Sequence, residues 1–115
     1  MTLFEECKSV LNEHFYQLTE NESKIIKLKL EGYLNNESLN KPTIISIDNI
    51  LCLASEKKIY VIADDVDIPI FETTISLLFE NIYDVICLAT KIYFMSEEMI
   101  IYSSFPHEIF YIFDI

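Results

Sequence analysis

The sequence predicts an α+β fold: a mixed, mainly antiparallel sheet of five to six strands, packed with two to three helices and containing one βαβ unit. Three observations support this class. Apolar residues recur at helical spacing behind N-terminal capping motifs, short runs of β-branched and aromatic residues fill the C-terminal half, and one stretch, 58–94, alternates between the two patterns.

The predicted βαβ unit lies within residues 58–94. Ile59–Ala63 has the composition of a buried strand, and from Phe71 onward apolar residues recur at helical spacing, with Pro69 in the first turn. Val85–Phe94 returns to β composition. It is either one strand or two that break near residues 90–91. Continuity is favoured because this segment contains neither glycine nor proline.

Two capping boxes predict the N-terminal helices. Thr2 with Glu5 opens a helix over about residues 3–16, and Thr19 with Glu22 opens a second over 20–31, which Gly32 would end. The second segment is ambiguous, because its leucines and isoleucines alternate with lysines as they would in a strand.

The remaining elements are a loop and short strands. Residues 35–42 form a polar loop closed by a proline. Residues 43–47 and 50–54 are strand-like, and 50–63 fits a hairpin. Further strands are predicted over 99–102 and 109–113.

Length and composition indicate one domain, spanning residues 1–115, that can bury a core. No apolar run is long enough to span a bilayer, and no secretory signal pattern opens the chain, so a cytoplasmic protein is expected. Cys7, Cys52 and Cys87 are odd in number and scattered, which predicts reduced thiols packed as small hydrophobes.

Charge and glycine content exclude whole classes of function. The chain has a net charge of −11 and no arginine, which argues against binding to nucleic acid or to anionic membranes. Residues 59–115 hold ten acidic residues and a single lysine, Lys91. Gly32 is the only glycine, so loops that cradle phosphates or dinucleotides are excluded.

If the two strands of the βαβ unit are parallel, one end of the sheet collects seven carboxylates. They are Asp64, Asp65, Asp67, Glu72, Glu97, Glu98 and Asp114. Such an edge could be a solvated rim, a divalent metal site at the three aspartates, or a docking surface for a basic protein. Tyr93 and Tyr102 are candidate anchors beside it.

No catalytic constellation emerges from the sequence. His107 with Glu108, and Ser103 with Ser104, lack a positioned base and oxyanion donors, so turn and strand-edge roles explain them. His14 fits the end of a helix. We therefore expect no enzymatic activity, no metal and no cofactor.

The whole-chain character resembles the immunity proteins of bacterial polymorphic toxin systems, especially those of contact-dependent growth inhibition. The resemblance rests on a capped N-terminal helix bearing FEEC, an acidic α+β domain without an active site, and a composition low in arginine but rich in isoleucine, asparagine and lysine. It implies a protein that binds a cognate toxin domain, frequently a basic nuclease, and covers its active site. The alternatives are a general DNA mimic with antirestriction activity and a small metal-dependent hydrolase.

Overall fold

A computed structural model describes residues 2–35, 42–50 and 55–114. The described residues form one seven-stranded antiparallel sheet. In spatial order its strands are β1 (Tyr16–Gln17), β4 (Phe71–Thr74), β3 (Lys58–Ala63), β5 (Lys91–Met95), β6 (Met99–Ser104), β7 (Ile109–Asp114) and β2 (Thr43–Ser46). The helices are α1 (Leu3–Leu11), the 3-10 turn η1 (Asn12–His14), α2 (Glu20–Leu34), α3 (Ile47–Ile50), α4 (Ile75–Glu80) and α5 (Ile82–Ile86).

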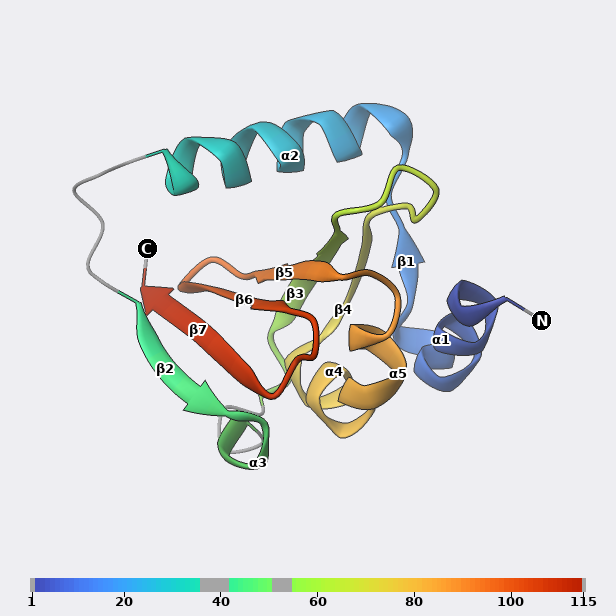
Figure 1. Cartoon of the computed structure of the whole chain (residues 1–115). Helices are drawn as coiled ribbons and strands as arrows, with labels where there is room; N and C mark the ends of the chain where they lie inside the picture. Colours follow the sequence, from blue (N-terminus) through green and yellow to red (C-terminus); the bar gives the residue numbers. More distant parts are fainter. Residues whose placement is uncertain (1, 36–41, 51–54, 115) are drawn as a thin grey trace.

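The sheet is the middle layer of three, with α2 over one face and α1, α4 and α5 over the other (Figure 1). Strand β3 shows why. Ile59, Val61 and Ala63 join the larger apolar cluster beneath α1, α4 and α5, whereas Ile62 joins the smaller cluster beneath α2. Successive side chains of a strand point to opposite faces, so a run of apolar residues fits a strand covered on both sides.

Strand β3 lies between β4 and β5 and is antiparallel to both. β4 and β5 therefore run in the same direction, and α4 and α5 carry the chain from one to the other (Figure 1). The predicted βαβ unit is wrong in this respect, because it makes residues 59–63 parallel to the strand that follows the helices. A strand that the prediction lacks, β4, reverses the chain before the helices begin.

Residues 71–74 are the reason for that error. Phe71 and Thr73 are buried while Glu72 lies between them at intermediate exposure, which is the alternation of a strand. The helix begins only at Ile75, where the Thr74 hydroxyl accepts a hydrogen bond from the Leu77 amide (3.3 Å). Pro69 is thus not in a first helical turn.

The prediction of one continuous strand over 85–94 is also wrong. Val85 and Ile86 end helix α5, and β5 begins at Lys91. Their side chains face the same apolar cluster as the sheet does, so composition alone does not separate a buried helix end from a buried strand.

Both N-terminal capping boxes are confirmed, with reciprocal hydrogen bonds between Thr2 and Glu5 and between Thr19 and Glu22. Residues 20–31 are helical, as predicted, but the helix passes Gly32 and ends at Leu34. The first helix is shorter than predicted. It stops at Leu11 because Asn12 takes a positive φ of 46°, which asparagine tolerates better than most residues.

The C-terminal strands are confirmed and slightly longer than predicted, at 99–104 and 109–114. Strand β2 covers most of the predicted 43–47, and the short helix α3 follows it directly. Residues 36–41, most of the predicted polar loop, lie outside the described residues, as do 51–54 of the predicted hairpin. None of the described helices is long and apolar enough to cross a membrane.

Cys7 and Cys87 are free thiols in different surroundings. Cys7 is buried, and burial, with smaller effects from Cys87 and Asp84, raises its pKa to about 12. Packing as a small hydrophobe is confirmed for Cys7. It is wrong for Cys87, which is exposed, and Cys52 lies outside the described residues.

We expect Thr19→Ala to lower the free energy of unfolding by about 1 kcal/mol, because the α2 capping box loses its side-chain acceptor. Urea unfolding followed by circular dichroism measures this. Thr19→Ser, which keeps the hydroxyl, is the control, and equal losses in the two variants would contradict a capping role.

The capping box of Thr19 and Glu22 also predicts that the stability of the fold depends on pH. The Thr19 amide and the Tyr16 hydroxyl both donate to Glu22, at 2.9 Å each, and these bonds hold the pKa of Glu22 below its ordinary value of 4.5. The stabilisation is therefore complete above pH 4.5 and is lost as the pH falls through the lowered pKa. Glu22→Gln should flatten the stability profile in that acidic window, and urea unfolding at a series of pH values measures this.

Candidate functional site

The seven predicted site carboxylates do not share one edge. Because β3 and β5 are antiparallel, Ala63 pairs with Ile92 and Tyr60 with Met95. The loop after β3 therefore lies at one end of the sheet, and the turn after β5 lies at the other. The prediction of a single acidic rim is wrong, because it lacks strand β4, at which the chain reverses.

The first end, here called the loop end, carries Asp64, Asp65 and Asp67. The turn between β6 and β7 lies there too, because Lys91 pairs with Ser104. The far end carries Glu97, Glu98 and Asp114, together with Lys57 and Lys58.

Lysines compensate the carboxylates of the far end. Lys57 forms an ion pair with Glu98, which raises the pKa of Lys57. Lys58 reaches Glu72 within β4 at 3.4 Å. Tyr93 and Tyr102 are half-buried on the α2 face with the Lys91 ammonium over their rings, and Tyr93 lines a cavity with Asp64 and Asp65 of the loop end. Any role for these residues in partner binding stays a prediction.

The loop-end aspartates are exposed, and their backbone is held in place. The Asp64 amide donates to the Lys91 carbonyl at 2.9 Å. The Asp65 carboxylate accepts from the Asp67 amide at 2.9 Å, a local turn that aspartate favours. Val66, at the tip between them, is 95% exposed. The loop thus presents three carboxylates and one apolar side chain to solvent.

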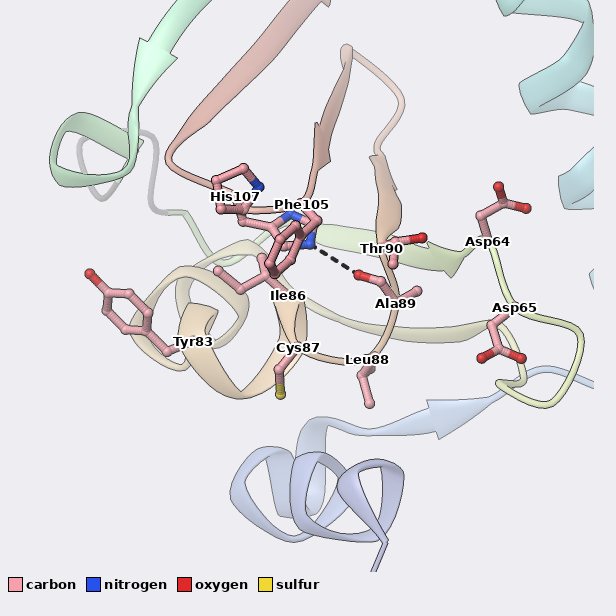
Figure 2. Close-up of a pocket in the computed structure, with 11 residues that line it drawn as sticks. Asp64, Asp65, Tyr83, Ile86, Cys87, Leu88, Ala89, Thr90, Phe105 and His107 are labelled. Carbon is pink, nitrogen blue, oxygen red and sulfur yellow. Dashed lines mark hydrogen bonds between the residues drawn. The ribbon is translucent and has the colours of Figure 1, made fainter.

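A cavity of about 580 Å³ adjoins this loop, here called the loop-end cavity (Figure 2). Three segments surround it: the aspartate loop, the end of α5 with the linker to β5, and the β6–β7 turn. Its lining residues are Asp64, Asp65, Tyr83, Ile86, Cys87, Leu88, Ala89, Thr90, Phe105, Pro106 and His107. Figure 2 shows the two aspartates to one side of the group and Tyr83 to the other.

His107 fastens two of these segments together. It is buried, and its Nε2 lies 3.0 Å from the Ala89 carbonyl oxygen, which can only accept, so Nε2 carries a proton. Its Nδ1 lies 2.8 Å from Ser103 Oγ, also buried. Both ring nitrogens are therefore engaged in structure. The backbone at His107 has a positive φ of 61°, and no sequence pattern signals this clamp.

Two aromatic side chains at the cavity are exposed instead of packed in the core. Phe105 is 76% exposed and Tyr83 is 68% exposed. The sequence alone assigns neither residue to a site. Helical periodicity does place Tyr83 off the apolar face of its helix, which is the one signal that could have identified it.

The arrangement is suited to binding. Within residues 2–35, 42–50 and 55–114, no three His, Cys, Asp or Glu side chains converge as metal ligands. Ser104 and Glu108 are exposed strand-end and turn residues, as expected. What the loop end offers is negative charge beside an open, largely apolar cavity.

The family comparison agrees with a binding role. The model of the CdiI immunity protein, EcoliA0-like, matches residues 1–113, and this places the chain in the class of immunity proteins of contact-dependent growth inhibition, which bind a cognate toxin. The chain belongs to the EcoliA0-like CdiI immunity protein family. The resemblance predicted from the sequence is thereby confirmed. No curated protein matches the chain.

We expect His107→Ala to destabilise the fold by about 1–3 kcal/mol, because the Ala89 carbonyl loses its donor and the buried Ser103 hydroxyl keeps only the Ile109 carbonyl, at 3.2 Å, as a partner. Chemical denaturation measures the loss. His14→Ala, an exposed histidine, should change stability by less than about 0.5 kcal/mol. A loss at His107 as small as that at His14 would contradict the clamp.

Proposed function

We propose that the protein is a non-enzymatic inhibitor that binds a basic nuclease toxin domain through the loop end and blocks its active site. Asp64, Asp65 and Asp67 are its principal charged contacts. The far-end residues Glu97, Glu98 and Asp114, and Glu72 on β4, have a smaller part.

One observation carries the proposal: the loop-end aspartates are exposed and take part in no ion pair with a described residue, whereas Glu98 and Glu72 do. Although Lys91 stands near Asp64, an exposed carboxylate outside any ion pair keeps most of its field for an approaching partner. It also lies beside exposed apolar surface, at Val66 and Phe105, that a partner can cover.

Charge indicates the kind of toxin. The inhibitor has a net charge of −11, and electrostatic complementarity speeds association while disfavouring wrong partners. A nuclease must present lysine and arginine to the phosphates of its substrate. Carboxylates docked on those residues occupy the substrate groove and exclude nucleic acid, without any chemical step by the inhibitor.

The test neutralises the loop end. The triple variant Asp64→Asn, Asp65→Asn and Asp67→Asn should associate with the cognate toxin domain about tenfold or more slowly at low salt. The difference should shrink as salt screens the field. The asparagine that replaces Asp65 keeps a side-chain oxygen for the turn, so the loop is preserved. Stopped-flow fluorescence at two salt concentrations provides the rates.

A matched control changes the net charge equally. Glu97→Gln, Glu98→Gln and Asp114→Asn also remove three charges, but at the far end, and should slow association much less. Equal slowing by the two triple variants would show a diffuse effect of net charge and overturn the assignment of the surface. Tight binding to unrelated DNA enzymes would instead indicate a general DNA mimic.

A further inference from the structure

We propose that the loop-end cavity receives one arginine side chain of the toxin, with its guanidinium between Asp65 and the ring of Phe105 and its aliphatic stem against the apolar lining. This rests on the proposed function, since it names the contact that anchors the same partner. It assigns a role to the cavity and to two exposed aromatic residues that the fold itself does not need.

The chemistry of the cavity matches a long cationic side chain. Ile86, Leu88 and Ala89 supply apolar lining, and Asp64 and Asp65 stand to one side of it (Figure 2). Arginine combines an apolar stem with a charged head, and it buries the stem where the head can reach a carboxylate. At about 580 Å³ the cavity has room for one such side chain.

The aromatic residues favour arginine over lysine. A guanidinium is planar and weakly hydrated, so it stacks on an aromatic face while it pairs with a carboxylate, whereas an ammonium is held more strongly by water. Phe105 and Tyr83 have mostly solvent-exposed rings at this cavity. An arginine between them and the aspartates would satisfy both kinds of contact.

The receiving groups are held before any partner arrives. The Phe105 amide donates to the Thr90 carbonyl at 2.6 Å, and the His107 ring fastens the same turn to Ala89. One oxygen of Asp65 is engaged by the Asp67 amide, which orients the carboxylate. A binding site that needs little ordering loses less entropy when it binds.

Two other cavities fit a cation less well. One of about 360 Å³, beneath α2, is lined by Lys27 as well as by Glu31 and the aspartate loop. Another, of about 340 Å³ at the far end, already holds the ion pair of Lys57 with Glu98. A positive charge from outside would meet a lysine in each of them.

The test is a double-mutant cycle with the toxin domain, read as the dissociation constant. Phe105→Ala should weaken binding about tenfold or more, while Leu28→Ala, an exposed apolar residue on α2, should not. Each toxin arginine is then changed to lysine. We expect one arginine whose replacement raises the dissociation constant about tenfold with the wild-type protein and much less with Phe105→Ala or Asp65→Asn.

The other outcomes show whether this inference fails alone or together with the proposed function. Strictly additive losses of affinity for all toxin arginines would overturn the arginine contact, and so would coupling of Phe105 to an apolar toxin residue. The proposed acidic surface would still hold in either case if the triple aspartate variant slows association. If neither Phe105→Ala nor the triple variant affects binding, both fail. Loss of self-association of the free protein in Phe105→Ala, at unchanged toxin affinity, would identify a second copy as the occupant.

Discussion

The antiparallel pairing of β3 with β5 is the constraint on which the rest of the molecule depends. Both strands are covered on both faces, and a shift of one residue would turn each side chain to the opposite layer. The register of Ala63 against Ile92 is therefore fixed by burial. It brings the loop after β3, the linker before β5 and the turn after β6 to one end of the sheet.

That register also divides the charge. The C-terminal half is strongly acidic, and gathering its carboxylates at one edge would have added their mutual repulsion. Instead, the far end receives Lys57, just before β3, and Lys58, its first residue, so Glu98 and Glu72 have partners there. The loop end lies a full strand length away from Lys57 and Lys58, and Lys91, which stands near Asp64 there, forms no ion pair with it, so the aspartates keep most of their negative field. The uneven field is thus a consequence of strand direction, not of composition alone.

The sequence predicts local features well and long-range placement poorly. Both capping boxes and strands β3, β6 and β7 follow from residue patterns, because each depends on neighbours within a few positions. Strand β4 is only four residues long and precedes a helix whose apolar periodicity extends back through Phe71, so the two patterns overlap. A prediction that lacks β4 gives every later strand the opposite direction relative to β3. The loop-end cavity was unpredictable for the same reason, since its three walls come from segments whose ends depend on that direction.

The groups exposed at the loop end contribute little to the stability of the fold. Val66, Phe105 and Tyr83 leave most of their surface in water, and the aspartates form no ion pair with the described residues. The clamp that fastens the turn carrying Phe105 to the linker before β5 is buried and built from different residues, His107 and Ser103. Surface side chains can therefore change at small cost in folding free energy while the frame beneath them persists. An inhibitor that must match one toxin and reject others needs this separation, because its contacts can be adjusted without rebuilding its core.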